Sequence, residues 1–179
     1  MPNFRTVRFG ELDYRQEDVI HLPEGLVGMP SLRDWLILEM GTDVPMKWFQ
    51  SLDRGDFGFP VSQAYLFHDD YNFPLGAPTR ERLGNQSPED IATLIITTIH
   101  AGGDKVTGNL MAPLVIDTDT RRGVQLTLDD AAYSIRQEIN YFKFGLAVNS
   151  ETAEDVGAAP ETADAMAENG DQVPEPAGV

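Results

Sequence analysis

Residues 106–136 constrain the fold of this chain more than any other stretch of its sequence. Two runs of apolar residues flank the turn 117–123, which is rich in Asp, Thr and Arg. This pattern predicts two strands of a compact sheet or barrel, joined by a solvated turn and followed by a short capped segment. Because the stretch holds almost no side chain suited to chemistry, it favours binding over catalysis. The apolar runs are formed by Leu110, Met111, Leu114, Val115 and Ile116, and by Val124, Leu126 and Leu128.

The rest of residues 1–150 also predicts short strands. Residues 93–100 (TLIITTIH) give the strongest signal, because β-branched residues dominate them, and the glycine turn 101–105 reverses the chain. Pro60 places residues 57–63 at a sheet edge or in a bulge, because proline cannot donate a ladder hydrogen bond. So many short strands at close spacing predict an antiparallel barrel or sandwich. Further strands are expected at residues 4–9, 18–22, 36–40 and 47–52.

Helix signals are few. Residues 31–35 can form one turn after a proline, and residues 78–83 form a second candidate that ends at Gly84. In residues 87–90, Ser87 precedes a proline and two acids, which is a capping sequence for a turn or two of helix. We therefore expect only one or two short helical turns.

The acidic charge is unevenly distributed along the chain. The net charge is -16, and residues 151–179 hold eight acids without any Lys, Arg or aromatic residue. This segment cannot bury enough apolar area to offset the entropy of ordering it, so its composition predicts disorder. Phosphates need cations near them, which argues against direct binding of nucleic acid. A basic protein is the more natural partner.

The compartment is expected to be the cytoplasm. The chain has no cysteine, which excludes disulfides and thiolate sites and fits a reducing environment. Its first residues lack the apolar core of a signal peptide. No apolar run approaches the roughly 20 residues that span a bilayer, so no membrane association is expected.

Asp117 and Asp119 form a D-x-D pair at the end of the apolar run 114–116. A strand ending in this pair resembles the nucleophile loop of haloacid-dehalogenase-like phosphatases, in which one Asp attacks phosphorus and the other acts as acid and base. That family has Thr or Val where Arg121 stands, and it needs a parallel α/β sheet that this pattern does not predict. The phosphatase stands as the alternative to a hairpin loop whose side chains bond to local backbone.

Neither a metal nor a cofactor is expected. His21, His68 and His100 lack the spacing of metal ligands, and no glycine-rich phosphate loop is present. His68 with the two acids that follow it could supply ligands, but an acidic loop of this kind is more often solvated. A barrel that binds a small ligand is a further alternative, which an interior filled by side chains would exclude.

An aromatic cluster provides the candidate partner-binding residues. Most aromatic residues at this density fill a core. Here they are mixed with acids, so an exposed loop or edge would form an interface with an apolar centre and an acidic rim. The candidates are Tyr65, Phe67, Asp69, Asp70, Tyr71 and Phe73.

The order of several motifs resembles that of the FliW family of flagellar assembly factors, over residues 3–139. The motifs are HLPEGLVG at 21–28, WFQSL at 48–52, SPED at 87–90, LMAPLVI at 110–116 after Asn109, and the pair Tyr133 and Ser134. The resemblance implies a mainly β fold, a small antiparallel β-barrel without a catalytic site. We therefore expect a FliW-like barrel domain over residues 1–141, followed by an acidic, disordered tail over residues 142–179.

The resemblance also implies a partner switch. FliW-type proteins bind flagellin in the cytoplasm, and they bind CsrA, the small basic RNA-binding protein that represses flagellin translation. When flagellin is exported, the freed FliW binds CsrA and lifts the repression. By this resemblance the chain is a monomer when free, is not an enzyme and does not bind nucleic acid directly.

Overall fold

The computed structural model describes residues 1–41, 44–84, 88–103 and 105–139. The predicted tail, residues 142–179, lies outside the described residues. The strands are, in chain order, β1 (Asn3–Thr6), β2 (Gly10–Asp13), β3 (Ile20–His21), β4 (Asp34–Glu39), β5 (Met46–Ser51), β6 (Gly58–Gln63), β7 (Ile91–Ile99), β8 (Val106–Gly108), β9 (Leu114–Asp117), β10 (Gly123–Gln125) and β11 (Gln137–Glu138). The helical segments are α1 (Ala77–Leu83) and the 3₁₀ turns η1 (Gln16–Asp18), η2 (Ala64–Leu66) and η3 (Pro88–Asp90).

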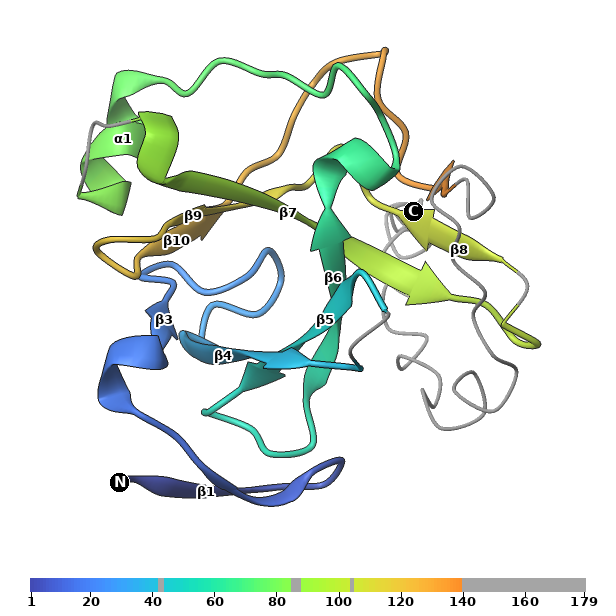
Figure 1. The fold of residues 1–179 in the computed structure, drawn as a ribbon. Helices are drawn as coiled ribbons and strands as arrows, with labels where there is room; N and C mark the ends of the chain where they lie inside the picture. The colour runs from blue at the N-terminus through green and yellow to red at the C-terminus, as the bar shows by residue number, and fades with distance from the viewer. Residues whose placement is uncertain (42–43, 85–87, 104, 140–179) are drawn as a thin grey trace, which may run out of the picture.

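The main sheet is antiparallel and curls back on itself. Its strands follow the order β10-β9-β7-β6-β5-β4-β3, and β8 with β11 extends it beside β7. The two ends meet where the His21 N–H donates to the Arg121 carbonyl oxygen at 2.8 Å, next to a single bridge between His21 and Arg122. Figure 1 shows β3 to β7 arranged around a common centre. The prediction of a mainly β, antiparallel barrel-like fold is confirmed, although one bridge does not fully close the barrel.

The stretch 106–136 forms three strands instead of the predicted two. β8 ends at Gly108, and β9 begins at Leu114 after a turn. Both strands pair with the same long strand β7, through Thr97–Ile99 and Ile91–Leu94 respectively. The apolar residues are divided between two strands because β8 pairs with the C-terminal part of β7 and β9 pairs with its N-terminal part. The hairpin of β9 and β10 around the polar turn is as predicted.

The barrel interior is filled by aromatic and aliphatic side chains. The Trp35 ring stacks on Phe49 with centroids 4.6 Å apart, and Phe59 packs beside both. All three are buried, as are Val61 and the aliphatic residues of the facing strands. Burial of this apolar area is the main contribution to stability. A filled interior argues against the small-ligand barrel.

Two local predictions were wrong. β6 is not an edge strand, because it pairs with β5 on one side and β7 on the other. Pro60 is tolerated there because the ladder with β7 begins only at Val61, one residue later. Residues 31–35 form no helical turn: β4 begins at Asp34, and the buried Trp35 indole donates to the Leu32 carbonyl at 3.2 Å.

The predicted helix at residues 78–83 is present as α1. Proline lies at its start, and Gly84 ends it in the left-handed conformation with φ of 83°. Leu83 is buried against Val115 and Val124, so α1 covers the outer face of β9 and β10 (Figure 1). The capping sequence before β7 forms the single turn η3, as expected.

The N-terminal strands form a separate hairpin below the barrel (Figure 1). Its turn is held where the Val7 N–H donates to the Gly55 carbonyl oxygen at 2.8 Å. The Arg8 guanidinium lies 4.5 Å from the centre of the Trp48 ring, a cation–π contact that fixes the same end. The hairpin therefore sits over the turn between β5 and β6.

Candidate partner-binding surface

Most of the predicted partner-binding residues lie on a long loop between β6 and α1. The loop follows η2 and crosses the end of the molecule opposite the β1–β2 hairpin (Figure 1). Tyr65 is 54% exposed, and Asp69 and Asp70 are also exposed. Tyr71 and Phe73 are half-buried. These five residues provide aromatic surface next to two carboxylates, which suits contact with a basic protein.

Phe67 is not available to a partner, and its assignment as a contact residue is corrected. Its side chain is only 9% exposed and belongs to a core cluster with Ile95, Val106 and Leu110. A Cβ atom added at Gly108 would lie 2.8 Å from two atoms of the Phe67 ring. Phe67 therefore fills the space that the glycine leaves in β8, a pairing across the fold that sequence order cannot show.

The loop is anchored through two tyrosines. The Tyr71 hydroxyl donates to the Leu110 carbonyl oxygen at 2.5 Å, and its ring lies 4.7 Å from that of Tyr133. Burial, with a smaller contribution from Tyr133, raises the pKa of Tyr71 above its ordinary value. The Tyr133 hydroxyl bonds to the backbone of Asn72. The loop is therefore held in one position against the segment that follows β10.

His68 also contacts this anchor. Its ring packs edge-on against Tyr133 with centroids 5.7 Å apart, and its Nδ1 is buried, with no hydrogen-bond partner in the part of the chain that the structure describes. The other histidines are engaged elsewhere, since His21 Nδ1 lies 2.6 Å from Asp34 and His100 Nε2 lies 3.0 Å from Thr107 Oγ1. Among the described residues, no group of three or more potential ligands could hold a metal ion.

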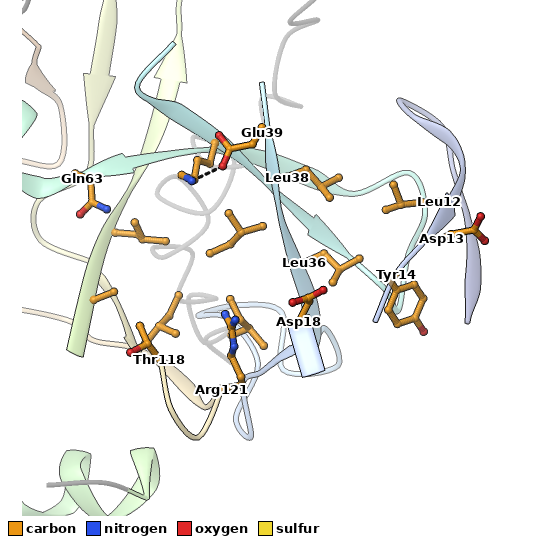
Figure 2. A pocket seen from close by; sticks show the side chains of 16 residues that line it. Leu12, Asp13, Tyr14, Asp18, Leu36, Leu38, Glu39, Gln63, Thr118 and Arg121 are labelled. Carbon is orange, nitrogen blue, oxygen red and sulfur yellow. Dashed lines mark hydrogen bonds and ion pairs between the residues drawn. The ribbon is translucent and has the colours of Figure 1, made fainter. Parts of the chain in front are cut away.

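A second concave surface lies at one mouth of the barrel. It is a groove of about 430 Å³ between the β1–β2 hairpin and the turn that joins β9 to β10 (Figure 2). Its walls include inward-facing residues of β3, β4, β7 and β9, which end at this mouth. The apolar lining consists of Leu12, Ile20, Leu36, Ile37, Leu38, Ala92, Leu94 and Ile116.

Charged residues form the rim of this groove. Lys47 Nζ lies 2.5 Å from Glu39 Oε1, across neighbouring strands. Arg15 donates two hydrogen bonds to Asp18, at 2.8 and 2.7 Å, and this interaction lowers the pKa of the Asp18 carboxyl. Asp13 lies toward the hairpin side, whereas Arg121 lies near Asp18 and also contributes to its lowered pKa. An apolar floor with an ionised rim is the usual composition of a protein-binding surface.

This groove was not predicted from the sequence. One signal was available in residues 36–38, where three consecutive apolar residues (Leu-Ile-Leu) interrupt the alternation of a half-exposed strand. Such a run indicates that both faces of the strand are apolar. Which segments surround those faces depends on strand order, which the run itself does not specify.

The D-x-D pair forms a hairpin turn. Asp117 is fully buried, and its Oδ1 accepts hydrogen bonds from the backbone N–H groups of Asp119 and Thr120, at 3.0 and 2.7 Å. Asp117 is the last residue of β9 and Asp119 lies in the turn that follows, so the pair belongs to an antiparallel hairpin and not to a parallel α/β sheet. The arrangement is the local side-chain cap that the hairpin interpretation expects, and it removes the structural context of the phosphatase alternative.

The described part of the chain contains no helix long and apolar enough to cross a membrane.

Comparison with known proteins gives a consistent result. The family model described as FliW protein matches residues 3–139. The chain is 34% identical over 135 residues to the flagellar assembly factor FliW of Caldanaerobacter subterraneus subsp. tengcongensis, covering 75% of this chain and 90% of the relative. It is 33% identical over 134 residues to the FliW of Syntrophus aciditrophicus, covering 75% of this chain and 85% of the relative. A solved crystal structure of the flagellar assembly factor FliW has the same fold, with a TM-score of 0.71, 24% identity and coverage of 76% of this chain and 96% of that one.

Proposed function

This chain belongs to the FliW family of flagellar assembly factors, and we propose that in this role it binds flagellin and the RNA-binding translational repressor CsrA. The family match over residues 3–139 is the observation that carries the proposal, because it spans nearly all of the described chain. Binding of CsrA would relieve repression of flagellin translation when flagellin has been exported. The protein acts without catalysis and in the cytoplasm, as a monomer when free.

Electrostatics supports CsrA as a partner. The first 150 residues hold 21 acids against 13 bases, and the last 29 residues add eight acids. A body of this charge attracts a small basic protein and increases the rate of encounter. Bound beside a basic RNA-binding surface, it adds negative potential that repels phosphate. RNA and this chain then each weaken the binding of the other by the same factor, as linkage requires.

The anchored loop is the proposed contact with CsrA. Tyr65, Asp69, Asp70, Tyr71 and Phe73 supply aromatic area and two carboxylates on one stretch of chain. Because Tyr71 and Asn72 are hydrogen-bonded to the body, the loop loses little conformational freedom on binding. The barrel domain over residues 1–141 is sufficient for this contact in the proposal, and the acidic tail adds long-range attraction.

Titration calorimetry with purified full-length chain, flagellin and CsrA tests the proposal. We expect saturable binding of each partner and, in a competition assay, release of labelled flagellin-mRNA leader from CsrA as the chain is added. If the chain binds neither protein at low ionic strength, the proposed function is wrong. If CsrA binds but RNA affinity does not change, the regulatory part of the proposal is wrong.

Paired charge reversals test the contact surface. Asp69→Lys with Asp70→Lys should weaken CsrA binding about tenfold at low salt, since each exposed charge contributes roughly 0.5–1 kcal/mol. The matched control is Glu11→Lys with Glu17→Lys, which changes the net charge equally at the opposite end of the molecule (Figure 1). Both effects should shrink as salt screens them. Equal weakening by the two pairs would show that total charge, and not the loop, determines affinity.

A further inference from the structure

One edge of β4 is unpaired over its second half. β4 pairs with β5 from Trp35 to Glu39, but it pairs with β3 only through Asp34 and Trp35. Before Ile20 the chain turns away into η1, where the Asp18 N–H bonds to Arg15 instead. The edge of β4 beyond Trp35 therefore has no neighbouring strand among the described residues.

The hydrogen bonds of the flanking residues show which backbone groups face this edge. The Leu22 N–H donates to the Arg33 carbonyl on the β3 side, and the Leu52 N–H donates to the Asp34 carbonyl on the β5 side, both at 2.8 Å. Hydrogen-bonding direction alternates along an antiparallel strand. The N–H and C=O groups of Ile37 and Glu39 consequently point away from β5, toward the missing neighbour. In the described part of the chain, no hydrogen bond satisfies them.

The groove at the barrel mouth follows this edge. All four residues from Leu36 to Glu39 line it, although alternate side chains of a strand point to opposite faces. Leu36 and Leu38 lie on the side of Leu12 and Tyr14, as Figure 2 shows. The opposite side of β4 faces the barrel mouth, where Ile37 meets the apolar residues of β7 and β9. Leu36 is buried, but Ile37 and Leu38 are each partly exposed, so the groove combines the edge with some apolar surface on both of its sides.

We propose that the free edge of β4 binds an extended segment of a partner polypeptide as an added strand. Backbone groups of the segment pair with Ile37 and Glu39, which gives affinity independent of side chains. Its alternate side chains contact Ile37 at the barrel mouth and the partly exposed Leu12 and Leu38 on the other side, so a run of consecutive apolar residues is selected. This inference goes beyond the proposed function, because it assigns a site and a class of ligand whatever the identity of the partner.

Shape and charge distinguish this ligand from others. Alternating N–H and C=O groups are complementary to a peptide backbone and not to a helix, whose own groups are already bonded. The edge is recessed between the β1–β2 hairpin and the turn at Arg121, so it admits one strand more readily than the barrel of a second copy. Asp18 is already paired with Arg15. Asp13 on the hairpin side is exposed and accepts only from an uncharged amide, that of Asn3, among its described contacts, so it favours a basic residue next to the apolar run.

A defined peptide probe tests the inference without reference to any natural partner. The probe is a capped peptide of sequence Lys-Thr-Val-Ile-Val-Thr-Lys with a fluorescent label, titrated with the full-length chain. We expect saturable binding, and slower hydrogen exchange at the Ile37 and Glu39 amides when the peptide is bound. A version of the peptide with alternate backbone nitrogens methylated should not bind. Absence of binding at millimolar concentrations, or binding without protection of those two amides, would overturn the inference.

Two substitutions at position 39 separate the contribution of the backbone N–H to peptide binding from that of the side chain. Glu39→Pro removes the edge N–H at an exposed strand end, and should weaken the peptide about fivefold, the net contribution of one hydrogen bond. Glu39→Ala removes the same ion pair with Lys47 but keeps the N–H, and should stay within about twofold of the wild type. Equal losses in both variants would contradict strand addition. A wild-type dimer that Glu39→Pro dissociates would show that a second copy occupies the edge, and would likewise overturn the proposal.

Discussion

Tyr133 and the backbone of Asn72 exchange two hydrogen bonds, although they lie 61 residues apart in the chain. The Tyr133 hydroxyl donates to the Asn72 carbonyl oxygen at 2.6 Å and accepts from the Asn72 N–H at 3.1 Å. The Tyr133 hydroxyl thereby bonds to both backbone polar groups of Asn72, as a residue of a neighbouring strand would. The position of the candidate CsrA-binding loop depends on a residue near the end of the described chain.

Tyr133→Phe should loosen this loop. Both hydrogen bonds disappear while the ring packing against Tyr71 is kept, so the expected loss in unfolding free energy is about 1 kcal/mol. Hydrogen exchange of the Asn72 amide should accelerate roughly tenfold. Tyr14→Phe, at a tyrosine that lines the groove beside the β1–β2 hairpin, is the control and should leave that exchange rate unchanged. An unaltered rate in Tyr133→Phe would show that the loop is held by packing alone.

Gly108→Ala should destabilise the protein by about 1–3 kcal/mol, as overpacking does in a filled core. The added Cβ would lie 2.8 Å from the Phe67 ring and from Ile95 Cγ2, so neighbouring side chains must move. Urea denaturation gives the measurement. A partial rescue is expected on combining the change with Phe67→Leu, which shortens the opposing side chain. Gly76→Ala is the control, because its Cβ would meet nothing closer than 3.7 Å.

Substitutions of the two aspartates of the hairpin turn should differ sharply in their effect on stability. Asp117→Ala leaves two backbone N–H groups without their acceptor and should cost about 1–3 kcal/mol of stability. Asp119 is exposed, and Asp119→Ala should change the midpoint of thermal unfolding little. The comparison also bears on the phosphatase alternative. Magnesium-dependent phosphatase activity that either substitution abolishes without unfolding the protein would revive that alternative.

Stability should fall at alkaline pH because of Tyr71. Burial, followed by the nearby Tyr133, raises the pKa of Tyr71 in the folded state. The resulting stabilisation is complete below the pKa of an unfolded tyrosine, about 10, and is lost as pH rises through the raised folded value, because the unfolded state releases the proton first. Unfolding free energies measured on both sides of pH 10 should decline less steeply in Tyr71→Phe. Equal slopes would mean that Tyr71 ionises normally in the folded protein.

Local sequence patterns predicted the helices, strands and turns well where neighbouring residues alone define them. β-branched residues specified β7, Gly84 specified the end of α1, and the polar turn specified the β9–β10 hairpin, whose Asp117 cap follows from its side-chain chemistry. Each of these features depends on residues within a few positions of one another. The aromatic and acidic composition of the loop at residues 65–73 was also readable, and it marked the candidate CsrA contact.

Features that depend on contacts between residues far apart in the chain could not be predicted from the sequence. Pro60 was expected at an edge, yet it lies within the sheet because the β7 ladder begins one residue beyond it. Phe67 was expected at a surface, yet Gly108 makes room for its ring in the core. Ile37 belongs to a free edge only because β3 is too short to cover it. The sequence by itself determined an acidic, antiparallel β protein of the FliW family; tertiary structure decided which side chains and backbone groups remain accessible, since accessibility depends on neighbours that are remote along the chain.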